Sequence, residues 1–248
     1  MSTSATKTVL ILGATSDIGR AAARRYAALA HTIILAARDL RSIEADAADL
    51  RLRHGVLVEG RGFDILDPAG FGPLLDGLPT LPDTVICLVG LLGDQAAGEA
   101  DARIADTVWR SNFTGPAALL GEVAGRMAAR GSGTIIGVSS VAGDRGRASN
   151  YLYGSAKAGF TAFLSGLRNR LAKKGVRVIT VKPGFVRTRM TEGMTLPSAL
   201  TAEPDEVAQA MVAAEARGRD VIYVRPIWRL IMAVIGAIPE PVFKRLSL

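Results

Sequence analysis

Short apolar runs alternate with helical stretches along almost the whole chain, and this alternation restricts the fold more than any other feature. Runs such as TVLILG and TIILAAR are almost entirely aliphatic, as strands buried on both faces of a parallel sheet are. In the stretches between them, for example DIGRAAARRYAALA, the apolar residues recur at the spacing of a helix. This order predicts an α/β fold, a Rossmann-like doubly wound parallel sheet with helices on both faces. The seven predicted strands lie within residues 8–13, 32–38, 56–67, 83–90, 133–140, 175–184 and 219–224.

The predicted helices fill the segments between these strands. They occupy residues 17–30, 39–55, roughly 101–130, and a segment that contains Lys157 and ends near Lys174. The 248 residues are enough to bury a full core, and no linker or internal repeat interrupts them. We therefore expect a single domain over residues 1–248, with an apolar and basic C-terminal extension over 225–248.

The few cysteines and histidines exclude two kinds of site. One cysteine, Cys87, cannot form an intrachain disulfide, and together with two histidines it offers no metal cluster, so we expect no metal. The N-terminal stretch has a single lysine and too short an apolar run for a signal peptide, and no window reaches the length of a membrane span. These features predict a cytoplasmic protein in a reducing compartment.

The formal net charge of +7 points to anionic partners. Nucleic acid, a membrane surface and anionic small molecules all fit such a charge. The chain has no Lys/Arg-rich block and only seven Phe, four Tyr and two Trp, so neither a basic stripe nor a set of stacking aromatics is present. Nucleic-acid binding is therefore disfavoured.

The residues that follow each strand matter most, because ligands of such sheets bind at the carboxyl ends of the strands. The first strand is followed by GATSDIG, in which Gly13 and Gly19 flank a turn that leads into a helix. Free N–H groups and the helix dipole favour a phosphate there. An ordinary strand-to-helix turn remains the alternative, and Asp17 within it could instead stabilise the helix N-terminus by its charge.

Three further strand ends carry candidate ligand contacts. Arg38 ends the second strand, where an acidic residue suits ribose hydroxyls and an arginine suits a 2′-phosphate. It favours NADP(H) over NAD(H), which stays open, with Arg41 as an assistant; the alternative is a solvated surface arginine. Asp64 either accepts a hydrogen bond from an adenine amino group or caps the next turn. Gly90 allows the backbone to pass close to a ligand.

The stretch SNYLYGSAKAGF contains two tyrosines and one lysine. Tyr153 and Lys157 are four residues apart and lie on one face of a helix, whereas Tyr151 is six residues from Lys157 and points elsewhere. Taken alone, the pair favours helix packing over a catalytic role.

Together, these motifs resemble the short-chain dehydrogenase/reductase family over essentially the full chain. The matching residues are GATSDIG, Asn112 in WRSNFTGP, Ser140 in GVSSVAG, YGSAK and KPGFVRT. Tyr153 follows Ser140 by thirteen residues, the usual offset in the family, so the resemblance implies that Tyr153, and not Tyr151, is catalytic. The implied catalytic residues are Asn112, Ser140, Tyr153 and Lys157. The implied cofactor-binding residues are Gly13, Thr15, Ser16, Asp17, Ile18, Gly19, Arg38, Asp64, Ile65, Gly90, Tyr153, Lys157, Pro183, Gly184, Val186 and Thr188.

Two departures from the family pattern stand near the cofactor turn. Leu12 replaces a common threonine, and Cys87 and Leu88 replace two asparagines of the usual NNAG motif. Because Gly90 is retained, we expect cofactor binding to persist. A narrower resemblance, carried by VGLLGD, GSAKAG, VRTRM and IPEPVFKRL, is to the ketoreductase subunits of decaprenylphosphoryl-ribose 2′-epimerases.

The resemblance implies reversible hydride transfer between a nicotinamide and a carbonyl or secondary alcohol. Tyr153 would be the acid, and we expect the Lys157 ammonium to lower the pKa of Tyr153 from its usual value of about 10. The Ser140 hydroxyl would donate to the same substrate oxygen. Asn112 would support a water relay behind Lys157, or else serve as a helix-bend or capping residue.

The C-terminal stretch favours apolar partners. Residues 227–238 are apolar apart from one arginine, and the side-chain charge over 225–248 sums to +3. The stretch predicts an interfacial helix in peripheral contact with an anionic membrane, or else a dimer-interface or core helix. Residues 189–200, with Met190 and Met194, form the expected substrate lid.

The substrate expected from the narrower resemblance is a polyprenyl-phosphate-linked 2-keto-pentose. The alternatives are another ketone, such as a 3-oxoacyl thioester, a steroid or a small alcohol, and a non-catalytic nucleotide-binding protein. The family resemblance also implies a homo-oligomer.

Overall fold

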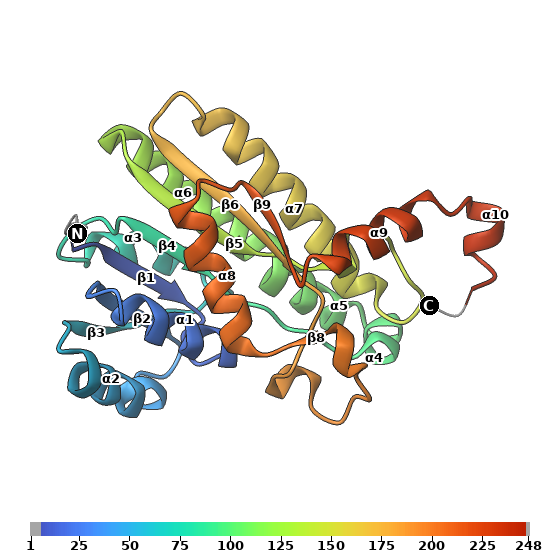
Figure 1. The fold of residues 1–248 in the computed structure, drawn as a ribbon, viewed down its shortest axis with the longest axis horizontal. Helices are drawn as coiled ribbons and strands as arrows, with labels where there is room; N and C mark the ends of the chain where they lie inside the picture. Colours follow the sequence, from blue (N-terminus) through green and yellow to red (C-terminus); the bar gives the residue numbers. More distant parts are fainter. Residues whose placement is uncertain (1–5, 247–248) are drawn as a thin grey trace.

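The chain folds around one parallel seven-stranded sheet, and the computed structural model describes residues 6–246 (Figure 1). Its strand order is β3-β2-β1-β4-β5-β6-β9, and every neighbouring pair is parallel. The predicted fold is therefore confirmed; the first five and last two residues of the expected domain lie outside the described residues. The strands are β1 (Thr8–Leu12), β2 (Thr32–Ala37), β3 (Val58–Gly62), β4 (Thr84–Cys87), β5 (Gly133–Val138), β6 (Val176–Pro183) and β9 (Val221–Val224).

Helices cover both faces of this sheet, each over its own apolar core. One core is formed with α1 (Asp17–Ala27), α2 (Arg41–His54) and α8 (Pro204–Ala216). The other is formed with α3 (Phe71–Asp76), α6 (Gly115–Arg130) and α7 (Tyr151–Leu171). The sequence analysis placed α1, α2 and α7 correctly but assigned no helix to the segments of α3 and α8.

The long helix predicted over 101–130 is broken in the structure. It consists of α5 (Ala102–Trp109), one π-helical turn η2 (Arg110–Thr114) and then α6. Pro116 has no N–H to continue the α-helical ladder, and Gly115 lies so close to the Ile65 carbonyl that an added Cβ would be 2.5 Å from that oxygen. The break turns Asn112 inward, where its side chain is fully buried.

A small second sheet holds the segment after β6. The strands β7 (Phe185–Val186) and β8 (Thr201–Ala202) pair in parallel. Between them lie two 3-10 turns, η4 (Arg189–Thr191) and η5 (Ser198–Leu200), so the expected lid has short ordered turns and both of its ends are fixed.

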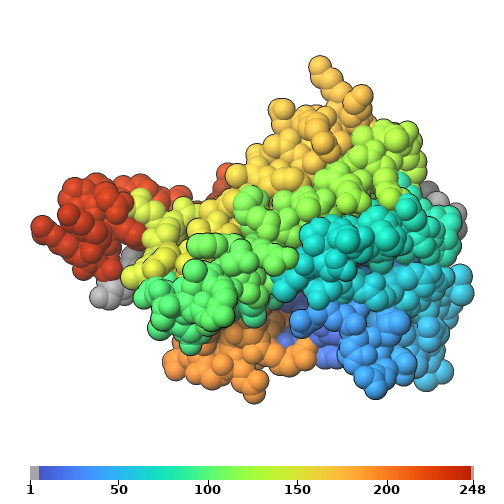
Figure 2. Space-filling model, turned by 180° about the vertical axis from the view of Figure 1, so that it is seen from behind, coloured from blue at the N-terminus to red at the C-terminus, as the bar shows by residue number. Residues whose placement is uncertain are grey.

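The C-terminal segment extends away from the sheet (Figures 1 and 2). It contains α9 (Ile227–Ala237) and α10 (Glu240–Phe243). Trp228 and Met232 of α9 are buried against Val141, whereas Leu230 and Val234 are 63% and 59% exposed. Within residues 6–246, no helix combines the length and the apolar character that crossing a membrane requires.

Candidate active site

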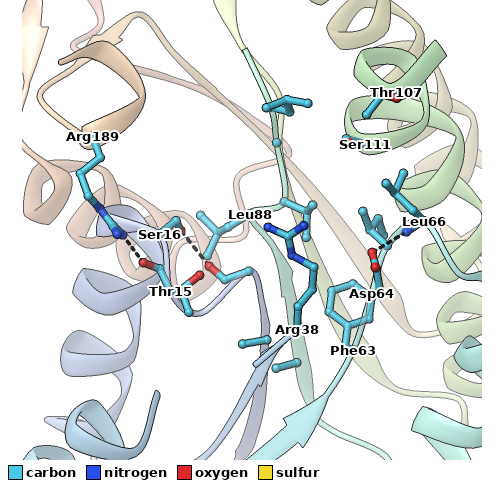
Figure 3. A pocket seen from close by; sticks show the side chains of 17 residues that line it. Thr15, Ser16, Arg38, Phe63, Asp64, Leu66, Leu88, Thr107, Ser111 and Arg189 are labelled. Carbon is cyan, nitrogen blue, oxygen red and sulfur yellow. Dashed lines mark hydrogen bonds between the residues drawn. The ribbon is translucent and has the colours of Figure 1, made fainter. Parts of the chain in front are cut away.

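A cavity of about 270 Å³ opens at the carboxyl ends of β1 and β4, where the strand order reverses (Figure 3). This is the topological switch point at which open α/β sheets bind ligands. Seven of the sixteen predicted cofactor residues line it: Gly13, Thr15, Ser16, Arg38, Asp64, Ile65 and Gly90. The other lining residues are Ala36, Ala37, Phe63, Leu66, Leu88, Val89, Leu91, Thr107, Ser111 and Arg189.

The turn before α1 has the compact form that a phosphate-binding turn needs. Gly13 has φ +86°, and a Cβ there would lie 3.2 Å from the Leu88 carbonyl carbon, so only glycine fits without strain. The Ser16 hydroxyl donates to the Gly13 carbonyl (2.8 Å) and accepts from the Gly19 N–H (3.0 Å). Ser16 is thereby the N-cap of α1.

Arg38 and Asp64 form the opposite wall of the cavity (Figure 3). Asp64 Oδ1 accepts the Leu66 N–H at 2.9 Å, so Asp64 does cap the next turn, and it also borders the cavity. Arg41, named as an assistant of Arg38, points away: it pairs with Asp39 at 3.4 Å, and its side chain is 87% exposed.

The remaining predicted cofactor residues do not line the cavity: Asp17, Ile18, Gly19, Tyr153, Lys157, Pro183, Gly184, Val186 and Thr188. Some of them have structural tasks. The Trp228 indole occupies the space where a Cβ of Gly184 would be, at 2.0 Å. Val186 is part of the core. Thr188 caps η4 through a reciprocal pair of hydrogen bonds with Thr191.

The four predicted catalytic residues come from three elements, and two of them, Asn112 and Lys157, lie close to Gly90. Ser140 follows β5 and hydrogen-bonds the Tyr153 hydroxyl. Lys157, one turn further along α7, is 3% exposed, and its Nζ is 5.6 Å from the Tyr153 ring centroid. A Cβ on Gly90 would be 3.0 Å from Asn112 Oδ1 and 3.5 Å from Lys157 Nζ.

The expectation that Lys157 lowers the pKa of Tyr153 is wrong for this structure. Burial raises the pKa of Tyr153 to about 12, and the hydrogen bond from Ser140 opposes this only in part. The Lys157 ammonium instead donates to the Val138 carbonyl at 3.1 Å. Burial also lowers the pKa of Lys157 to about 8, because a charged group loses its hydration there.

Asn112 supports the backbone beside the site. Its amide nitrogen donates to the Leu91 carbonyl (2.6 Å) and the Val108 carbonyl (2.8 Å), and its oxygen accepts the Leu91 N–H (3.2 Å). The helix-bend role that the sequence left open is therefore present. The water relay stays a prediction.

Sequence reasoning missed a polar cluster beside Ser140. Lys182, at the end of β6, pairs with Asp144, and the Tyr223 hydroxyl donates to the same carboxylate at 3.0 Å. These bonds hold the segment that follows Ser140, through Asp144, in place. The available signal was that Lys182 precedes Pro183 at a strand end, but its two partners are 38 and 41 residues away in the chain.

Comparison with known proteins places this site in a family. Residues 7–197 match the family model described as short chain dehydrogenase. An uncharacterized oxidoreductase of Mycobacterium tuberculosis is 40% identical over 241 residues, which are 96% of each chain. A short-chain dehydrogenase from Sphingobium yanoikuyae, solved in complex with NADPH, is 28% identical with a TM-score of 0.81, over 94% of this chain and 97% of that one.

A bulky-bulky ketone specific alcohol dehydrogenase from Comamonas testosteroni is 26% identical with a TM-score of 0.79, over 96% of each chain. The sequence relative and the two solved structures are thus similar to this chain over nearly its whole length. The chain is therefore an oxidoreductase that belongs to the short-chain dehydrogenase family.

Proposed function

We propose that this oxidoreductase transfers a hydride between NADP(H) and a carbonyl or secondary alcohol. The observation that carries the proposal is the cavity at the switch point, with the Gly13 turn on one wall and Arg38 on the other. The turn suits a diphosphate, and Arg38 stands where a 2′-phosphate of the adenosine ribose would lie. The NADPH complex of the Sphingobium relative supports the same cofactor.

The side chains near Gly90 can manage the proton of such a reaction. The nicotinamide supplies the hydride when it is bound. With a pKa of about 12, Tyr153 holds its proton at neutral pH and can donate it to the carbonyl oxygen during reduction. Ser140 can donate a hydrogen bond to the same oxygen. Lys157, with a pKa of about 8, is mostly charged at pH 7, and its Nζ lies 5.6 Å from the centre of the Tyr153 ring.

Replacing Arg38 tests the cofactor assignment. In Arg38→Ala we expect the Kd for NADPH, measured by nicotinamide fluorescence, to rise about 10- to 100-fold, as the loss of a charge-assisted bond to phosphate predicts. The Kd for NADH should stay unchanged. Arg41→Ala is the matched control, because Arg41 is exposed and lies outside the cavity. Equal loss for NADPH and NADH, or tighter NADH binding by the wild type, would overturn the NADP(H) assignment.

The exposed face of α9 supports a large apolar substrate, as in a polyprenyl-phosphate-linked 2-keto-pentose. Ile227, Leu230 and Val234 are 46%, 63% and 59% exposed and share one side of the helix. The only charged residue of α9 is Arg229. The buried side of α9 packs on Val141, next to Ser140, so the helix lies near the catalytic residues and its exposed face points away from them. We propose that this face contacts an anionic membrane that carries the substrate.

Vesicle binding tests this membrane contact. Wild-type protein should sediment with phosphatidylglycerol vesicles and much less with phosphatidylcholine vesicles. The double variant Leu230→Asp/Val234→Asp should lose binding by more than about tenfold, since two buried apolar side chains are worth several kcal/mol. Leu52→Asp is the control, because Leu52 is 87% exposed on α2. If the wild type binds neither kind of vesicle and the double variant differs from it only in oligomeric mass in solution, the face is an interface between copies of the chain. Another ketone then becomes the better candidate substrate.

A further inference from the structure

Arg189 joins two segments that meet only in the folded chain, the expected lid and the turn before α1. Its backbone N–H donates to Asp17 Oδ2 at 2.8 Å, and its Nε donates to Asp17 Oδ1 at 3.2 Å. Its Nη2 donates to the Thr15 carbonyl. Figure 3 shows this side chain reaching Thr15 at the edge of the cavity that it lines.

The turn itself has few donors left for an anion. Four of its N–H groups are already bonded within the protein, those of Gly13, Ala14, Ser16 and Gly19. At most the N–H groups of Thr15, Asp17 and Ile18 remain for a ligand. A dinucleotide diphosphate carries two negative charges, and three neutral donors balance such a group only in part.

Asp17 makes this shortage worse. Its carboxylate lies in the first turn of α1, where it stabilises the helix dipole but repels a phosphate. Arg189 compensates for that charge through an ion pair. The guanidinium has five N–H donors, and its bonds to the described residues use one on Nε and one on Nη2. Three donors therefore remain beside the cavity.

We propose that Arg189 binds the diphosphate of the dinucleotide and, through Asp17, holds the segment 189–200 closed over it. The inference rests on the dinucleotide-binding function proposed above. It adds a second positive charge to the cavity wall, besides that of Arg38. It also explains why the first residue of the lid, and not one at its tip, lies at the cavity wall.

Arg187, two residues before Arg189, provides a matched control. Arg187 has the same charge and a similar exposure, but it pairs with Glu203 at 2.8 Å and does not line the cavity. Arg187→Ala thus removes a neighbouring arginine without affecting the turn.

The experiment compares two ligands on the full chain. In Arg189→Ala, the Kd for NADPH should rise about 10- to 100-fold, whereas the Kd for adenosine 2′-monophosphate, which lacks the diphosphate, should stay within about twofold of wild type. Arg187→Ala should match wild type for both ligands, and Arg189→Lys should recover part of the loss. Retained binding of the monophosphate also shows that the variant is folded.

Two further measurements separate a direct contact from a purely structural ion pair. Asp17→Asn should bind NADPH at least as tightly as wild type, because it removes a negative charge and frees Arg189. NADPH should protect residues 189–200 from limited proteolysis in wild type and Arg187→Ala, but not in Arg189→Ala.

The outcomes distinguish this inference from the proposed function. If wild type binds neither NADPH nor NADH, both are overturned. If wild type binds NADPH and Arg189→Ala binds it equally well, or Asp17→Asn loses as much affinity as Arg189→Ala, only the role of Arg189 is overturned.

Discussion

Replacing Tyr153 by Phe should lower kcat for NADPH-dependent ketone reduction about 10²- to 10⁴-fold, the usual contribution of a positioned acid. The Kd for NADPH should change little, because the lost hydroxyl hydrogen-bonds Ser140 and does not line the cavity. Steady-state kinetics with a panel of ketones, together with fluorescence titration of NADPH, measures the two quantities separately.

Tyr151→Phe is the matched control, since Tyr151 lies two residues earlier on the same helix. It is 43% exposed and hydrogen-bonds Glu99 on the surface, away from Ser140. Loss of the Tyr151 hydroxyl should leave kcat within about twofold of the wild-type value and the free energy of unfolding within about 0.5 kcal/mol of it. Equal activity of the Tyr153 and Tyr151 variants would show that the acid is another group.

Replacing Lys157 by Met should abolish activity and yet stabilise the fold. The ammonium is 3% exposed and donates only to the Val138 carbonyl among the described residues, so its burial is poorly compensated. Methionine fills a similar volume without a charge. We expect a gain of about 1–3 kcal/mol at pH 7, which raises Tm by about 2–4 °C for each kcal/mol in a chain of this size.

The stability that Lys157→Met gains over wild type should decrease as pH rises. Burial lowers the pKa of Lys157 to about 8 from an ordinary 10.5. Between these two values the unfolded chain binds more protons than the folded chain, so wild-type stability rises with pH across that range. The stability difference between Lys157→Met and wild type should therefore be largest below pH 8 and shrink toward pH 10.5. Denaturant unfolding at several pH values measures it, and a less stable variant, or a difference that ignores pH, contradicts the expectation.

Much of the fold was predictable because it depends on local patterns. Apolar runs of strand length identified the strands of the main sheet other than β3, since a strand covered on both faces has no polar side; β3 has the largely polar sequence VEGRG. The third strand was predicted too long, within residues 56–67. β3 ends at Gly62, and the residues after it form a turn that Asp64 caps. The turn at Gly13 was also readable, because its glycine and its position between strand and helix are local features.

Of the candidate site, the sequence analysis could identify residue types at strand ends and on one face of a helix. Seven of the cofactor candidates line the cavity, and Ser140, Tyr153 and Lys157 lie together. The helix break at Asn112 was foreseen only as an alternative, because it depends on how closely Gly115 approaches the Ile65 carbonyl in another element.

Properties that depend on distant neighbours came only from the folded structure. Arg189 and Asp17 are 172 residues apart in the chain, and no local pattern pairs them. The pKa of Tyr153 was predicted in the wrong direction because Lys157 is visible in the sequence, whereas the burial that raises this pKa is not. The local order of residues in the sequence specifies which chemical groups are present and on which face of a helix or strand they lie. Packing between elements decides how far water is excluded from them, and hydration controls the free energy of a charge.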